Sequence, residues 1–212
     1  MSSKSILLLG GGGHCRSVID VIEEEGSFNV AGIVDRQEKL GEKISGYEVI
    51  GSDDQLPELV REYGRCLVTV GQLKSASLKI KLYRLAEESD AEIPVLISPR
   101  AFVSKNAVIE KGTVVFHGAV VNSGAVIGQN CIVNSGAIVE HDAVIRDHVH
   151  IAPGAIVNGH CRIESGSLLG SGAVMVQQTS LGENVIIGAG SVVTKSISEP
   201  GVYAGVPAKK IS

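Results

Sequence analysis

Four of the chain's six histidines lie within residues 137–160, in a segment that is otherwise mostly aliphatic. One of them, His141, is followed directly by Asp142. An imidazole beside a carboxylate suits general-base chemistry, because the acid selects the ring tautomer and stabilises the imidazolium form. The pair is therefore a candidate for removing a proton from an amine or a hydroxyl group.

A repeat of six residues must position this pair. From Ala101 onward, the third residue of each six is large and aliphatic at all 16 positions, and the first is Ala, Cys, Ser, Thr or Val. Each six can form one short strand and one tight turn, and three such sides close a triangular coil. We therefore expect a solenoid of parallel strands over residues 99–195, with the aliphatic column stacked along its axis.

Residues 18 apart in the sequence then lie one above another, about 5 Å apart like neighbouring strands. On this spacing Gly159 stacks over His141, and His160 stacks over Asp142. Gly159 would leave open space beside the His141 ring. His160 either shares the Asp142 carboxylate or is a solvent-exposed residue of the coil corner.

The repeat resembles the hexapeptide-repeat acyltransferases, whose repeats form a left-handed parallel β-helix. The stretch IVEH-x8-H, which contains His141 and His150, is similar to the VIEH-x8-H of the family's amino-sugar acetyltransferases. The resemblance implies that His141 is the general base, that Asp142 supports it, and that His150 lies near the acyl thioester. It also implies that the backbone N–H of Gly159 binds the thioester carbonyl.

Other features of this segment leave alternatives open. His150 interrupts an outward row of aliphatic residues, so it is either an interface residue or the acyl-site residue that the resemblance implies. Arg146 stands where the family usually has glycine, which leaves the shape of that turn open. No metal is expected, because zinc carbonic anhydrases of this fold use two histidine ligands five residues apart, and this chain has no such pair.

The outward-facing second residue of each six is apolar at 13 of 16 positions. Every third one falls on the same side of the coil. The first face contains Phe102, Val120, Ile138, Ile156, Val174 and Val192, the second contains Val114, Ile132, His150, Leu168 and Ile186, and the third carries Arg162 and Ser180. Apolar faces of this length should not meet water. We therefore expect a closed homo-oligomer, and the family resemblance implies a homotrimer.

Residues 1–98 follow a different pattern, in which short apolar runs alternate with helical spacing. We expect strands at residues 5–10, 28–35, 66–71 and 93–98, and helices at residues 14–25, 53–64 and 75–89. Alternating strands and helices indicate a small parallel sheet. The expected fold class is thus a small Rossmann-like α/β domain followed by a left-handed parallel β-helix.

The first expected strand is followed by GGGGHCRSVID, at the position where a parallel sheet presents backbone amides to a phosphate. The stretch does not fit the dinucleotide fingerprint GxGxxG. It resembles the GxxGH turn of nucleotide-sugar acetyltransferases with the same front domain, including enzymes that make diacetamido sugars and sialic acid O-acetyltransferases. The resemblance implies a nucleotide-sugar site formed by Gly11, Gly12, Gly13, His14, Asp35, Arg36, Gly71 and Gln72.

Residues 196–212 are expected to form a C-terminal tail, which contains GVYAGVPAKKI. This stretch resembles the family's YxGxPA(K/R) ending, so Pro207, Lys209, Lys210 and the preceding Gly190 are implied to contact acyl-CoA. The basic side chains would approach the phosphates of the coenzyme. The alternative is a mobile basic tail. The expected acyl donor is acetyl-CoA, acting as a co-substrate.

Composition limits the partners. The net charge of −4 and the lack of a Lys/Arg run argue against nucleic acid or an anionic membrane as the main partner. No apolar run is long enough to span a bilayer. The four cysteines have no metal-ligand spacing and suit free thiols in a reducing compartment. We expect a cytoplasmic protein.

Together these features predict an acetyl-CoA-dependent N-acetyltransferase that acts on a nucleotide-linked amino sugar for bacterial surface glycans. One alternative is an O-acetyltransferase of a sialic-acid-like sugar. A second is a non-catalytic β-helix scaffold, which the histidine and carboxylate constellation disfavours. The residues do not indicate which sugar, which nucleotide base or which acyl length is used.

Overall fold

The computed structural model describes residues 4–212, and the chain divides into two compact units. The N-terminal unit runs to Gly71 and resumes over Ser77–Ser98. The second unit comprises Gln72–Ala76 and Pro99–Ser212. A short segment of the front half of the sequence thus belongs to the C-terminal unit.

The N-terminal unit contains the strands and helices that the apolar pattern predicts, and two more strands. Its elements are β1 (Lys4–Leu9), α1 (Gly13–Glu25), β2 (Phe28–Val34), η1 (Gln37–Lys39), β3 (Lys43–Ile44), β4 (Tyr47–Gly51), η2 (Asp53–Gln55), α2 (Leu56–Tyr63), β5 (Cys66–Val68), α3 (Ser77–Glu88) and β6 (Leu96–Ile97). The helix expected from residue 53 begins as the 3-10 turn η2, and α2 follows it. The expectation of three helices between strands is confirmed.

Five strands form one sheet in the order β3-β4-β2-β1-β5. The β1–β2, β1–β5 and β2–β4 pairs are parallel, as expected, whereas β3 and β4 pair antiparallel. The residues of β1 from Ile6 to Leu9 are at most 1% exposed, because helices cover the sheet. The last expected strand, at residues 93–98, shrinks to β6 and is not part of this sheet.

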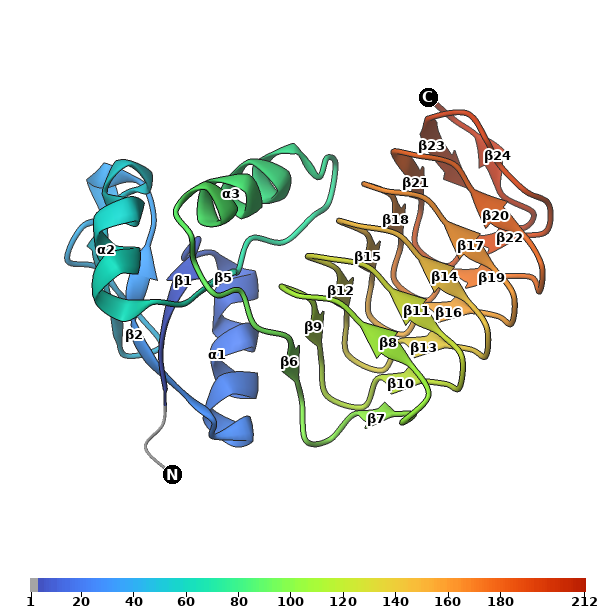
Figure 1. Cartoon of the computed structure of the whole chain (residues 1–212). Helices are drawn as coiled ribbons and strands as arrows, with labels where there is room; N and C mark the ends of the chain where they lie inside the picture. Colours follow the sequence, from blue (N-terminus) through green and yellow to red (C-terminus); the bar gives the residue numbers. More distant parts are fainter. Residues whose placement is uncertain (1–3) are drawn as a thin grey trace. The chain divides into compact units, whose positions relative to one another are not determined.

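The second unit is a left-handed parallel β-helix built mostly of two-residue strands (Figure 1). Its strands are β7 (Phe102–Val103), β8 (Val108–Ile109), β9 (Val114–Val115), β10 (Val120–Val121), β11 (Val126–Ile127), β12 (Ile132–Val133), β13 (Ile138–Val139), β14 (Val144–Ile145), β15 (His150–Ile151), β16 (Ile156–Val157), β17 (Arg162–Ile163), β18 (Leu168–Leu169), β19 (Val174–Met175), β20 (Ser180–Leu181), β21 (Val185–Ile187), β22 (Val192–Val193), β23 (Gly201–Ala204) and β24 (Lys209–Lys210). Pairing confirms the predicted register, since Ile138 lies beside Val120 and Ile156.

The coil core is the aliphatic third column of the repeat. Its residues from Val115 to Val193 are at most 1% exposed, which confirms the predicted stack along the axis. The backbone ladder continues through Arg146, whose N–H donates to the carbonyl of Ile163 at 2.9 Å. The residue in place of the usual glycine therefore leaves the coil path unchanged.

Every sixth residue from Gly112 to Gly190 has a left-handed backbone at a coil corner. Glycine occupies most of these corners, because a side chain is strained in that region. Six corners instead carry Asn130, Asp142, His148, His160, Gln178 and Asn184. Asn and Asp tolerate this conformation best among residues with side chains. The corners thus offer polar side chains in stacked positions.

The two apolar outward faces differ in exposure. On the first, Phe102 is 59% exposed, and the other members are partly exposed. On the second, Val114, Ile132, His150 and Leu168 are all at most 7% exposed in the single chain. The expectation that the second face must be covered by another subunit is therefore wrong for these residues.

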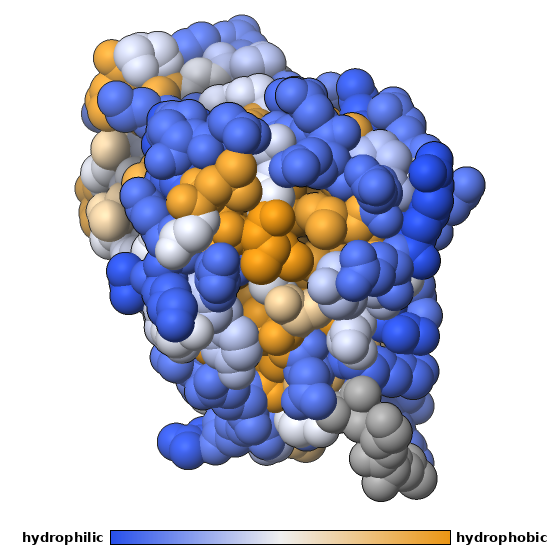
Figure 2. Space-filling view, turned by 90° about the vertical axis from the view of Figure 1, so that its left-hand side faces the viewer, coloured by the Kyte–Doolittle hydropathy of each residue, from blue (hydrophilic) through white to orange (hydrophobic). Residues whose placement is uncertain are grey.

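Two surface properties bear on partners. Within residues 4–212, no helix combines the length and apolar content that crossing a membrane requires. The side of the molecule seen in Figure 2 is largely hydrophilic around a central apolar patch. Such a patch within a polar surface is typical of a surface that another molecule covers.

Candidate active site

His141 and Asp142 follow β13 at a corner of the coil. The backbone of Asp142 is left-handed, with φ of 58°, so its side chain leaves the wall of the solenoid. Gly124 occupies the same corner one coil earlier, and a Cβ there would lie 2.4 Å from Asp142 Oδ1. Glycine at position 124 therefore makes room for the carboxylate.

The expected pairing of His141 with Asp142 is present in the structure. His141 Nδ1 lies 2.9 Å from Asp142 Oδ2, and each side chain is about half exposed, at 49% and 51%. A carboxylate oxygen accepts a hydrogen bond, so Nδ1 of a neutral His141 carries the proton, and Nε2 keeps its lone pair. Nε2 is thus able to accept a proton from a substrate.

Gly159 lies directly beside Nε2 of His141. A Cβ at position 159 would be 2.6 Å from His141 Nε2 and 2.7 Å from Cε1. The coils are held in register here, since His160 N–H donates to the His141 carbonyl at 3.1 Å. The stacking expected from the 18-residue spacing is confirmed, and only glycine leaves the ring in its place.

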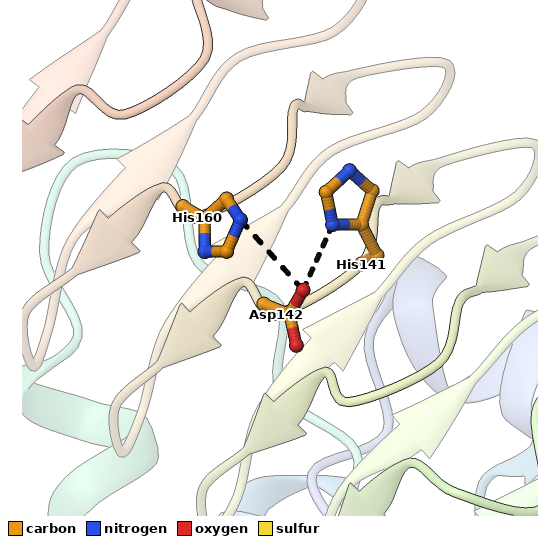
Figure 3. Close-up of side chains that lie close together, drawn as sticks. All are labelled: His141, Asp142 and His160. Carbon is orange, nitrogen blue, oxygen red and sulfur yellow. Dashed lines mark hydrogen bonds and ion pairs between the residues drawn. The ribbon is translucent and has the colours of Figure 1, made fainter.

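His160 is the third member of this corner. Its Nε2 is 3.8 Å from Asp142 Oδ2, and its ring meets the His141 ring edge-on at a centroid distance of 5.2 Å. Figure 3 shows both imidazoles directed at the same carboxylate oxygen. Of the two alternatives for His160, the geometry favours sharing the carboxylate, although the side chain is also 50% exposed.

His150 has partners other than His141 in the single chain. Its Nδ1 is 2.8 Å from the Gln72 carbonyl oxygen, and its Nε2 is 3.1 Å from Asn134 Nδ2. Asn134 Oδ1 accepts the N–H of Ser135, which turns the amide nitrogen toward His150. His150 Nε2 is therefore the acceptor, and Nδ1–H donates to Gln72. A role at the acyl thioester stays a prediction.

The glycine turn of the N-terminal unit has the form of an anion site. Gly12 is the N-cap of α1, and a Cβ at Gly12 or Gly13 would meet nothing within 4 Å. A helix N-terminus with open space before it presents backbone N–H groups to a phosphate. Gly71 lies close by, since a Cβ there would be 3.5 Å from the Cβ of His14.

Asp35 holds Gly11, the second glycine of this turn. Its Oδ2 accepts the Gly11 N–H at 2.7 Å and the Lys39 Nζ at 2.9 Å, and its Oδ1 accepts the Arg36 N–H at 2.7 Å. Desolvation raises the pKa of this carboxyl group, but the hydrogen bonds from Lys39, Arg36 and Gly11 outweigh it and hold the pKa below its ordinary value. Asp35 is therefore a charged brace for the turn.

Gln72 differs from the other residues predicted to bind the nucleotide sugar in the unit to which it belongs. It belongs to the solenoid unit, is 2% exposed, and its Nε2 donates to the carbonyls of Gly166 and Ser167 at 2.8 and 3.2 Å. A cavity of about 250 Å³ adjoins it, lined also by Lys74, Ser75 and Asn184 among others. The side chain of Gln72 fixes the segment Gln72–Ala76 on the solenoid.

The tail closes the last coils of the solenoid. Tyr203 is 8% exposed, and β23 pairs with β21 while β24 folds back on β23. Lys209, Lys210, Pro207 and Gly190 are exposed, and Lys210 Nζ lies 3.4 Å from a Glu199 carboxylate oxygen. The tail is thus ordered by strand pairing, contrary to the alternative of a mobile tail, and it presents two cations to solvent.

Comparison with known proteins agrees with both halves of the structure. Residues 5–78 match the PglD N-terminal domain, and residues 124–159 and 160–195 match the bacterial transferase hexapeptide model of six repeats. The acetyltransferase domain of PglB from Neisseria gonorrhoeae, solved with acetyl coenzyme A, is 34% identical. That match covers 99% of this chain and 100% of the PglB domain, with a TM-score of 0.90. This chain belongs to the hexapeptide-repeat acyltransferases.

Other matches of this acyltransferase extend over nearly the whole chain. The perosamine N-acetyltransferase from Caulobacter crescentus was solved with CoA and GDP-perosamine in a variant that has asparagine in place of one histidine. It is 31% identical, with 98% of this chain and 97% of that chain covered and a TM-score of 0.91. WeeI from Acinetobacter baumannii, at 24% identity and a TM-score of 0.87, shares the fold. No curated protein matches the sequence significantly.

Two polar residues that contact predicted site residues of the acyltransferase are not predicted from its sequence. Asn134 contacts His150, but it lies 16 residues away, which is off the 18-residue stacking period. Lys39 pairs with Asp35 in an i,i+4 relation across a turn that carries no repeat pattern. A charge pair at that spacing was the one available signal for Lys39.

Proposed function

We propose that this acyltransferase moves the acetyl group of acetyl-CoA to the amino group of a nucleotide-linked sugar. The observation that carries the proposal is the corner where His141 Nδ1 is bound to Asp142 while Nε2 faces Gly159. That arrangement is a general base with an oriented, unblocked nitrogen. The relatives solved with acetyl coenzyme A, or with CoA and GDP-perosamine, support both substrates.

The reaction follows from this geometry. His141 Nε2 takes a proton from the sugar amine while the amine nitrogen attacks the carbonyl carbon of the thioester. The attack gives a tetrahedral intermediate with negative charge on oxygen. The N–H of Gly159 stabilises that oxygen by hydrogen bonding. The intermediate then expels the CoA thiolate, which takes up the proton. Asp142 keeps the imidazole in the right tautomer and stabilises its charged form.

The remaining predicted residues divide between the two substrates. In our proposal Gly11, Gly12, Gly13, His14, Asp35, Arg36 and Gly71 form the nucleotide side, because amides at the start of α1 suit a phosphate. Gly190, Pro207, Lys209, Lys210 and His150 form the acyl-CoA side. The four cysteines are free and buried, which suits a reducing compartment, and we infer a cytoplasmic location.

The direct test is release of free CoA thiol from acetyl-CoA in the presence of a panel of UDP-, dTDP- and GDP-amino sugars. We expect release with at least one amino sugar and none with the matching sugar that has a hydroxyl group in place of the amine. Release with free sialic acid alone would contradict the choice of an amine acceptor. A lack of release with every acceptor would contradict the proposed acetyl transfer to a nucleotide-linked amino sugar.

Asp142→Asn is expected to lower kcat less than removal of His141 does. Asparagine keeps the left-handed backbone of position 142 unstrained but removes the negative charge. We expect a loss of about 10- to 100-fold, by analogy with carboxylates that orient metal-bound histidines. Steady-state kinetics at saturating acetyl-CoA measures it, and an unchanged kcat would show that the carboxylate does not assist the base.

The pair Lys209→Met and Lys210→Met is expected to raise the KM for acetyl-CoA about 10-fold and leave the KM for the sugar unchanged. Each exposed charge pair with a phosphate contributes up to about 1 kcal/mol. Both lysines are exposed on β24, so the fold tolerates the change. Lys105→Met, at an exposed position of the first coil, is the matched control. If the double variant and the wild type had equal KM values for acetyl-CoA, these lysines would not contribute to the donor site.

We propose a homotrimer in which the first apolar face, from Phe102 to Val192, is covered by a neighbouring solenoid. Ile138→Glu is expected to split or aggregate the assembly, because it would bury a charge without a partner. Val144→Glu is the control. Val144 lies on the strand after Ile138, on the third outward face, so this variant should leave the assembly intact. Light scattering measures both, and a monomeric wild type would contradict the trimer.

A further inference from the structure

The corner that carries His141 also gathers three metal-ligating side chains. His141, Asp142 and His160 each offer one ligand atom, and these atoms all lie within 4.8 Å of one another. Both imidazoles are directed at the carboxylate (Figure 3). Each side chain is about half exposed, so an ion can approach from solvent.

We propose that this cluster binds one divalent transition-metal ion, represented by Zn²⁺, through two imidazole nitrogens and one carboxylate oxygen. Water would complete four-coordination. Tetrahedral zinc with bonds of about 2.0–2.2 Å holds its ligand atoms roughly 3.4 Å apart. The observed separations of 2.9 Å and 3.8 Å from Asp142 Oδ2 lie on either side of that value. Small rotations of exposed side chains therefore suffice to close the site.

The backbone already holds the ligands in place. His160 and Asp142 occupy the same corner of consecutive coils, and the His160 N–H donates to the His141 carbonyl at 3.1 Å. Imidazole nitrogens with one carboxylate are ligands that suit zinc, copper and nickel. The charge of the ion is partly balanced by Asp142. No movement of the solenoid is needed.

A bound metal ion acts as an inhibitor, and this consequence rests on the proposed function. When an ion takes Nδ1 of a neutral His141, the ring proton resides on Nε2. Nε2 then has no lone pair to accept a proton from the acceptor amine. Asp142 is also occupied by the ion. Metal binding and proton abstraction therefore exclude each other at this corner.

Binding is tested first by titrating the full-length protein with Co²⁺ and recording its visible absorption, which is strong only for sites of low coordination number. We expect one such site per chain, displaced by Zn²⁺. His160→Asn and His141→Asn should each weaken binding at least about tenfold, as expected for loss of a ligand. Asparagine suits the left-handed backbone of position 160. His148→Asn, at another left-handed corner, is the control and should bind Co²⁺ like wild type.

Inhibition is tested by following the acetylated sugar itself under buffered free Zn²⁺, because the CoA thiol binds zinc. Wild type and His148→Asn should be inhibited, whereas the activity that His160→Asn has without metal should need at least about tenfold more Zn²⁺ for half inhibition. A wild type without the Co²⁺ band, or unchanged binding in both ligand variants, would overturn the site. If no sugar is acetylated, the proposed function fails, and the Co²⁺ titration still decides the metal site.

Discussion

His141→Ala is expected to lower kcat about 10²- to 10⁴-fold, the usual contribution of a general base. The variant keeps the solenoid, because His141 is an exposed corner residue outside the buried aliphatic column. Binding of acetyl-CoA should survive, since the variant leaves the Gly159 backbone and the other proposed donor residues in place. Steady-state kinetics gives the loss in kcat, and calorimetric titration gives the Kd for acetyl-CoA.

His148→Asn provides the comparison for this variant. It removes another corner histidine while keeping its left-handed backbone, and we expect near wild-type kcat. If His141→Ala kept most of its activity and His148→Asn were inactive, the proposed active site would be at the wrong corner of the coil. The match to IVEH-x8-H would then be a coincidence of a repetitive sequence.

The solenoid is predictable from sequence because its period is set by the number of residues that one side of the coil needs. One strand and one turn use six residues, so a column such as Val121, Val139 and Val157 reports the register directly, and all three are buried. The same arithmetic predicts that Gly159 lies over His141, and the close approach of a Cβ at 159 to that ring confirms it. Stacking is thus readable wherever the repeat is unbroken.

Contacts outside the repeat could not be predicted in this way. The strands β3 and β4 are short and partly polar, so they give no apolar run of the kind that marks β1. The segment Gln72–Ala76 packs on the solenoid through the hydrogen bonds of Gln72 and His150, and no local pattern announces a contact between residues 78 positions apart. The burial of the second apolar face within the single chain could not be predicted either, because no local pattern indicates contacts between residues so far apart in the sequence.

Gly159→Ala is expected to have the second largest effect, a fall in kcat of about 10²-fold. The added Cβ would lie 2.6 Å from His141 Nε2, so the imidazole must move away from its position beside Asp142. A displacement of about 1 Å in a reacting group costs on the order of 10²-fold in rate. The backbone of Gly159 is not left-handed, so alanine itself introduces no strain there.

A double-mutant cycle separates this effect from a general loss of structure. If Gly159→Ala acts by displacing the His141 ring, it should cost little in a chain that already carries His141→Ala, because the displaced group is gone. Residues in direct contact show this kind of non-additivity, whereas independent sites add. The measurement is kcat for the four chains at saturating acetyl-CoA and amino sugar, with thermal melts to check folding. An equal loss from Gly159→Ala in both backgrounds would mean that the glycine serves the acyl group or the fold rather than the base.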